Sequence, residues 1–86
     1  MSRPAHEKRW RALAASTQWS VVFDLASAIK IREAKIANMK GRGEGGQVNK
    51  TRLRTAIAAD RALLMLLQSV TPESVFADAL EKGNRP

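Results

Sequence analysis

The sequence predicts an all-α protein that folds as a single helical domain over residues 1–86. Two long stretches repeat apolar residues at alternating spacings of three and four, the pattern of a helix with one buried face. No segment shows the period-two alternation of a strand, and a cluster of glycines separates the two stretches. With 44% hydrophobic and 27% charged residues, the chain has the composition of a protein that packs a core.

The first stretch lies between Pro4 and Lys40, where the chain has no glycine and no further proline. It permits one long helix or two helices that break near Ser16 and Thr17. Ser2 would cap a first helix that has Pro4 in its first turn, and Ser16 would cap a second helix. The pattern predicts helix from about residue 18 to residue 40, with a buried seam formed by Val22, Leu25, Ile29, Arg32, Ile36 and Met39.

Four glycines fall within residues 41–46, and each costs about 1 kcal/mol relative to alanine inside a helix. We therefore expect the first helix to end here and residues 41–48 to form a glycine-rich loop. Asn49 is a good N-cap for a second helix over about residues 50–69. Its seam repeats the same spacing at Leu53, Ile57, Asp60, Leu64 and Leu67. The two helices would form an antiparallel hairpin.

Thr71, Pro72 and Glu73 are typical of a helix start: a capping hydroxyl, a proline at the first helical position and an acid in the first turn. They predict a short third helix over about residues 72–82. Gly83 would end it before a polar tail over residues 83–86. One face of this helix is apolar, at Val75, Phe76, Ala79 and Leu80.

Each seam contains one charged residue, Arg32 in the first helix and Asp60 in the second. Neither has an opposite charge three or four residues away in its own helix, and the hairpin brings the two to nearly the same level. We predict that they pair across the helices and set the register of the hairpin. The alternative is that both lie at the margin of the seam in water.

Residues 62–67 are apolar on every side of the second helix, so one neighbouring helix would leave part of them exposed. We expect a helical-bundle homodimer, because a chain this short gains much from association. Its dimer or core face would be Leu63, Leu64, Met65, Leu66 and Leu67. The alternative is a monomer in which the third helix, with Trp10 and Leu13, covers this side, and Trp19, Phe23 and Phe76 close the core.

Several function classes are disfavoured. The chain has no cysteine and only one histidine, His6, so we expect no metal site and no catalytic residue. The glycines at 41–46 have the spacing of a P-loop, but Gln47 stands where the lysine is required. We expect no enzyme activity and no cofactor. The longest apolar run is far shorter than a membrane span, and the N-terminus lacks the apolar region of a signal peptide, so we expect a cytoplasmic protein.

The formal net charge is +7, and most of it falls on residues 30–61, which carry nine basic and three acidic residues. Lys50, Arg52 and Arg54 are expected in the first turns of the second helix, where the helix dipole disfavours cations. Cations around a helix N-terminus that follows glycines suit a phosphate or a carboxylate. The candidate anion site is Lys40, Arg42, Lys50, Arg52 and Arg54. The alternative is a charged face that only keeps the protein soluble.

Nucleic acid is the first candidate partner, bound through its phosphates without sequence selectivity. The loop is too long for a helix-turn-helix, and residues 30–61 contain no aromatic side chain for base stacking. The second candidate partner is an acidic protein surface. In that case the chain would be a regulator or inhibitor, for example of a protein that itself handles nucleic acid.

Overall fold

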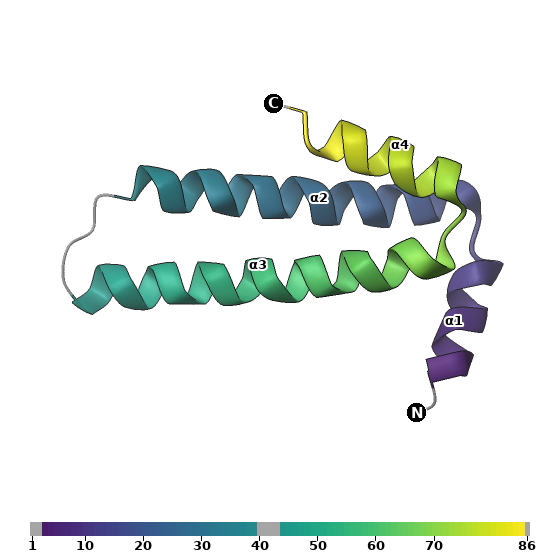
Figure 1. The fold of residues 1–86 in the computed structure, drawn as a ribbon, viewed down its shortest axis with the longest axis horizontal. Coiled ribbons are helices and arrows are strands. Elements are labelled where there is room, and N and C mark those ends of the chain that lie inside the picture. Colours follow the sequence, from purple (N-terminus) through teal and green to yellow (C-terminus); the bar gives the residue numbers. More distant parts are fainter. Residues whose placement is uncertain (1–2, 40–43, 86) are drawn as a thin grey trace.

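The structure of the protein is a computed structural model, and it describes residues 3–39 and 44–85, apart from the side chains of residues 3, 4, 44, 45 and 47. These residues fold into helices and form no strand, so the all-α prediction is confirmed (Figure 1). The helices are α1 (Arg3–Ala12), α2 (Ala15–Asn38), α3 (Glu44–Val70) and α4 (Glu73–Gly83).

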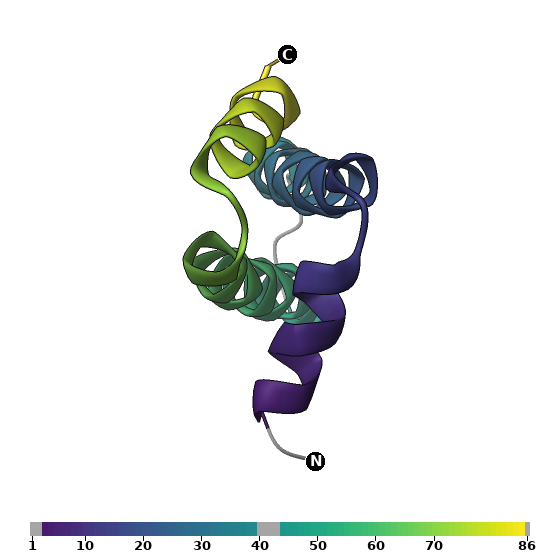
Figure 2. The ribbon, with the colours of Figure 1, turned by 90° about the vertical axis from the view of Figure 1, so that its right-hand side faces the viewer.

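The two long helices, α2 and α3, lie side by side and run in opposite directions (Figure 1). When the molecule is viewed along its long axis, α2 lies between α4 and α3, and α1 lies beside the C-terminal end of α3 (Figure 2). Just past the end of α4, the carbonyl oxygen of Asn84 accepts a hydrogen bond from Lys30 of α2. Beyond that level, residues 31–39 and 44–61 extend as a pair of helices that we call the arm.

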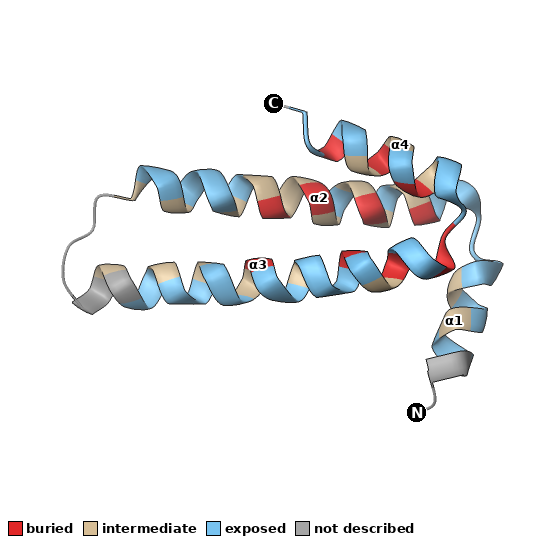
Figure 3. Cartoon of the chain, viewed as in Figure 1, coloured by how far each residue is buried: buried red, intermediate tan, exposed pale blue. Residues whose placement is uncertain are grey.

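The core lies where α2, α3 and α4 meet, and the arm has little of it (Figure 3). The seam of α2 is fully buried at Val22 and Ile29 but only half-buried at Ile36 and Met39. The reason is that α4 covers only the N-terminal half of α2, so burial falls toward the arm. The buried apolar side chains of the core cluster are Val22, Ile29, Ile57, Leu64, Leu67, Val70, Phe76 and Ala79.

The N-terminal stretch forms two helices rather than one, and they separate at Leu13 and Ala14. The N-cap of α2 is Ala14, which makes no side-chain cap bond, so Ser16 is not the cap that the sequence suggested. The buried Gln18 instead donates from Nε2 to the carbonyl oxygen of Trp10 at 2.9 Å. This bond fixes the end of α1 against the first turn of α2. Ser2 lies outside the described residues.

The helix α3 begins at Glu44, so the predicted N-cap at Asn49 is wrong, and the predicted loop over 41–48 is helical from Glu44 onward. Glycine is costly in the middle of a helix, but Gly45 and Gly46 lie in the first turn. There the backbone N–H groups have no partner within the helix, and glycine is accepted more readily at helix starts than in interiors. The first-turn position explains why two glycines do not stop this helix.

The N-cap of α4 is Pro72, and Thr71 makes no cap bond, contrary to the sequence prediction. The buried hydroxyl of Thr71 instead accepts a hydrogen bond of 2.8 Å from the indole nitrogen of Trp10. At the other end of α4, Gly83 lies against α2. A Cβ atom built there would lie 2.6 Å from the Cβ of Ala26 and 2.9 Å from the carbonyl oxygen of Phe23. Gly83 is thus required for the close packing of α4 on α2.

Candidate functional site

The basic side chains of α3 do not surround the start of the helix. Because α3 begins at Glu44, Lys50 lies in its second turn, and Arg52 and Arg54 lie in the third. The unpaired N–H groups of a helix belong to its first four residues, so these cations and those groups do not converge on one anion. The predicted placement of the three cations in the first turns is wrong. Lys40 and Arg42 lie outside the described residues.

The three cations lie on two flanks of the arm. Lys50 and Arg54 are four residues apart and share one flank of α3, whereas Arg52 projects from the opposite flank. The seam of α3, with Leu53 half-buried and Ile57 buried, faces α2 between them. The two flanks are too far apart around the helix for all three cations to hold one small anion together. They can instead contact separate charges of an extended anion.

Within the part of the chain that the structure describes, Lys50, Arg52 and Arg54 form no ion pair, and neither does Lys35 of α2. Lys50 is half-buried, and the other three are exposed. These four side chains, which we call the arm cations, are therefore available to an external partner. The remaining described cations of the arm, Arg32 and Arg61, are paired.

Arg32 and Asp60 form an ion pair between α2 and α3, and their side chains are 36% and 21% exposed. Beside it, Arg61 of α3 pairs with Glu33 of α2 at 3.0 Å. The basic residue of the first pair, Arg32, is on α2, and that of the second pair, Arg61, is on α3. Both pairs are partly open to water, so each contributes at most about 1 kcal/mol to stability.

A shallow depression lies between α2 and α3 on the flank of the arm that carries Arg54, with a volume of about 450 Å³. Its walls combine apolar and charged groups, namely Glu33, Ile36, Arg54, Ile57, Ala58 and Arg61. Since Glu33 already pairs with Arg61, Arg54 is the cation of this depression that remains unpaired. The depression can accept an anionic group that also presents apolar surface.

The five residues of the predicted dimer or core face, 63–67, lie in different surroundings. Leu64 and Leu67 are buried in the core cluster with α2. Leu63 and Leu66 line a separate cavity beneath α1, together with Trp10. Met65 points elsewhere and is 73% exposed. A run of consecutive apolar residues necessarily faces several sides of a helix, and the structure divides this run among three environments.

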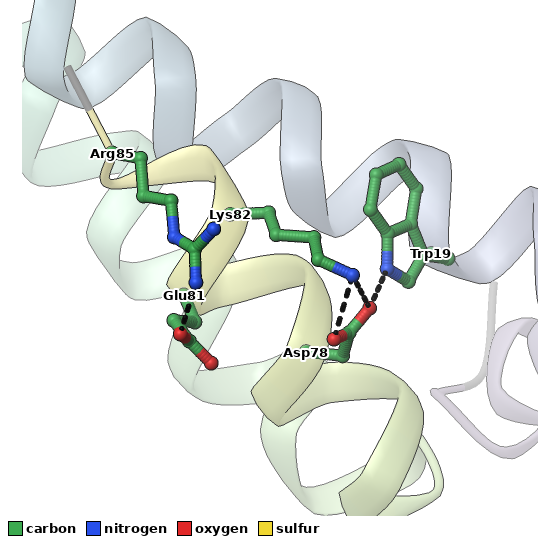
Figure 4. A network of polar contacts seen from close by, with 5 residues as sticks. All are labelled: Trp19, Asp78, Glu81, Lys82 and Arg85. Carbon is green, nitrogen blue, oxygen red and sulfur yellow. Dashed lines mark hydrogen bonds and ion pairs between the residues drawn. The ribbon is translucent and has the colours of Figure 1, made fainter.

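Sequence reasoning missed a polar network that fastens α4 to α2 (Figure 4). The indole nitrogen of Trp19 donates to Oδ2 of Asp78 at 2.8 Å, and Lys82 pairs with the same carboxylate at 3.0 Å. The ring of Trp19 also stacks on Phe23, with centroids 5.0 Å apart. The hydrogen bond from Trp19 and the contacts with Lys82 lower the pKa of Asp78 below its ordinary value. The network holds two helices together, and no sequence spacing reveals it because Trp19 and Asp78 are 59 residues apart.

Among residues 3–39 and 44–85, no group of three histidine, cysteine, aspartate or glutamate residues is placed to hold a metal ion. His6 is exposed on α1. The described helices also include none that is long and apolar enough to cross a membrane. No family model, curated protein or solved structure matches the chain.

Proposed function

We propose that the protein is a small non-enzymatic binding module whose arm contacts nucleic acid phosphates without sequence selectivity. The observation that supports this most is the position of the arm cations, which are unpaired among the described residues and lie on both flanks of a narrow pair of helices. A backbone with a phosphate at every nucleotide offers many separate negative charges, whereas one small anion does not. Residues 30–61 contain no aromatic residue, which disfavours recognition by base stacking.

The salt dependence of binding gives the first prediction. If Lys35, Lys50, Arg52 and Arg54 each neutralise one phosphate of duplex DNA, the logarithm of the binding constant falls with a slope of about −3.6 against the logarithm of salt concentration. Raising the salt from about 50 to about 200 mM would then weaken binding by about 150-fold. Fluorescence anisotropy with labelled random-sequence duplex and single strand measures this directly.

The matched variants remove three positive charges each. One carries Lys50→Ala, Arg52→Ala and Arg54→Ala in the arm, and its slope should fall to about −0.9. The other changes the exposed Lys8, Arg9 and Arg11 of α1 to alanine, and it should keep most of the wild-type slope. Equal effects of the two variants would mean that net charge alone drives binding. Absence of binding at the lower salt concentration would refute the proposal.

The second candidate is a regulator or inhibitor that engages an acidic protein surface through the arm. It is favoured by the depression between α2 and α3, where Arg54 stands beside the apolar Ile36 and Ile57. Acidic protein segments present carboxylates next to apolar groups, whereas a phosphate backbone does not. Competition between labelled duplex and poly-glutamate distinguishes the two. Displacement of duplex at equal charge concentration would favour the protein partner.

The homodimer predicted from the sequence stays part of this proposal. Two copies would place two arms on one polyanion, and the second contact would then benefit from the high local concentration that the first creates.

A further inference from the structure

The helix α4 packs mainly on α2 and little on α3 (Figures 1 and 2). Residues of α3 and α4 line a groove between these two helices. It consists of two neighbouring depressions with volumes of about 300 and 350 Å³, which share Gln68, Phe76 and Leu80 in their walls. The α3 wall is Leu64, Met65 and Gln68, and the α4 wall is Phe76, Ala77 and Leu80. We call this surface the α3–α4 groove.

Apolar side chains at the edge of the core line the α3–α4 groove, beside the polar Gln68 that both depressions share. Phe76 and Leu64 belong to the core cluster, and Leu80 packs against that cluster. Met65 stands at the rim and is 73% exposed, more than any other large apolar side chain in the described residues. An unbranched, adaptable side chain at the rim of an apolar groove is well suited to enter a matching groove.

The ends of the α3–α4 groove carry opposite charges. Arg61, which within one copy pairs with Glu33 of α2, lines the end toward the arm, and Glu73 lines the end toward the start of α4. Arg61 precedes Met65 by four residues, about 6 Å along the helix, and Glu73 shares the far depression with Gln68, three residues after Met65. Two copies related by a two-fold axis near Met65 would set Arg61 of each copy near Glu73 of the other. The groove is therefore complementary to itself, as an isologous contact requires.

The distribution of charge favours the same arrangement. Residues 62–86 carry two basic and three acidic residues, so this segment has a net charge of −1, whereas residues 30–61 carry +6. Contact through the α3–α4 groove brings together segments with little net charge. The two-fold axis makes the two α3 helices antiparallel and sends the two arms in opposite directions, which keeps the like charges apart.

We infer that the α3–α4 groove binds the same groove of a second copy of this chain, with Met65 near the two-fold axis and Arg61 paired with Glu73 across it. This inference rests on the homodimer of the proposed function and names its surface, but it does not depend on the proposed contact with nucleic acid. A dimer that does not bind nucleic acid would support this inference and refute the proposed contact with nucleic acid. A monomer that binds nucleic acid would do the reverse.

Cysteine cross-linking tests the position of the axis, because the chain has no cysteine of its own. In Met65→Cys, the two introduced thiols would lie close together, and mild oxidation should convert most of the protein to a covalent dimer. Ile31→Cys is the matched control, since Ile31 is 67% exposed on α2 and lines none of the depressions. Equal cross-linking of the two variants, or none in Met65→Cys, would overturn the inference.

Sedimentation equilibrium tests the contacts without a cross-link. Met65→Lys should be monomeric while keeping its helix content by circular dichroism, because the side chain is exposed in the single copy. Arg61→Glu and Glu73→Arg should each weaken the dimer about tenfold, and the double exchange should restore it. Arg61→Glu also removes the ion pair with Glu33 within one copy. Melting curves of this variant at concentrations where it is monomeric measure the stability lost through that pair. The inference fails if the wild type is monomeric up to about 1 mM, or if Met65→Lys dimerises like the wild type.

Discussion

At the scale of single residues, Asp78 shows how one carboxylate can join two helices. Its oxygens accept from the indole of Trp19 on α2 and from Lys82 one turn later on α4. Both donors favour the charged form of the carboxyl group, so its pKa in the folded protein lies below the ordinary value. A group of this kind stabilises the fold when it is ionised and loses that effect when it is protonated.

The substitution Asp78→Asn gives a pH-dependent prediction. The carboxylate contribution is complete above the unfolded pKa of about 4 and disappears as pH falls through the lower folded pKa. The variant should therefore be less stable than the wild type at pH 7, and the difference should shrink as pH is lowered below about 4. Urea unfolding at a series of pH values measures this. A stability difference that stays constant across the range would show that the ionised carboxylate contributes nothing.

At the scale of elements, the sequence predicts the bodies of the helices better than their ends. Each of the two seams, within residues 22–39 and 53–67, is a spacing of apolar residues that can be read from neighbouring positions. The structure has a helix, α2 or α3, at each seam. The helix ends depend on partners that are distant in sequence. Thr71 has the form of an N-cap, but its hydroxyl bonds to Trp10, 61 residues away. No local pattern reveals that choice.

The candidate site was predictable only as a set of charges. Composition identified the basic segment, and the arm cations do project from it. Their placement around the helix start depended on where α3 begins. The sequence does not reveal that boundary, because glycine disfavours the interior of a helix but is tolerated in the first turn, where Gly45 and Gly46 lie. The α3–α4 groove was not predictable, since it arises from α4 packing on α2 rather than on α3.

The packing of α4 on α2 gives a prediction for Gly83→Ala. The preference of about 1 kcal/mol for alanine over glycine applies to helix interiors and is smaller at a helix end such as Gly83, whereas the added Cβ would lie 2.9 Å from a backbone oxygen that cannot move alone. We expect a net destabilisation of about 1–3 kcal/mol, typical of an overpacked contact. Ala26→Gly should partly rescue it by removing the atom 2.6 Å away. Thermal unfolding measures both, and a stabilised Gly83→Ala would contradict the close approach of the two helices.

At the scale of the whole molecule, the protein combines a packed body with an arm that has little core. The body buries side chains from three helices, whereas Ile57 is the buried apolar residue that the arm contributes within the described residues. The arm also carries most of the net charge. The arm is therefore the less stable part, because it buries little apolar surface and because its like charges repel one another.

Hydrogen exchange should separate the two parts. Amides of residues 31–38 and 50–58 should exchange faster than those of 20–29 and 62–69, because local opening is easiest where few apolar groups are buried. Higher salt should slow exchange in the arm more than in the body by screening the cations. Mass spectrometry of peptic peptides resolves these segments. Uniform protection along α2 and α3 would show that the arm is as stable as the body.

The two ion pairs at the base of the arm affect the alignment of α2 and α3 more than they affect stability. Arg32 and Glu33 are adjacent on α2, and Asp60 and Arg61 are adjacent on α3, with the charges in opposite order across the interface. If α3 slid or rolled so that the partners were exchanged, Arg32 would face Arg61 and Glu33 would face Asp60. Two attractions would become two repulsions. The pairs thus select one alignment of the helices by penalising the wrong one, even though they add little to the stability of the right one.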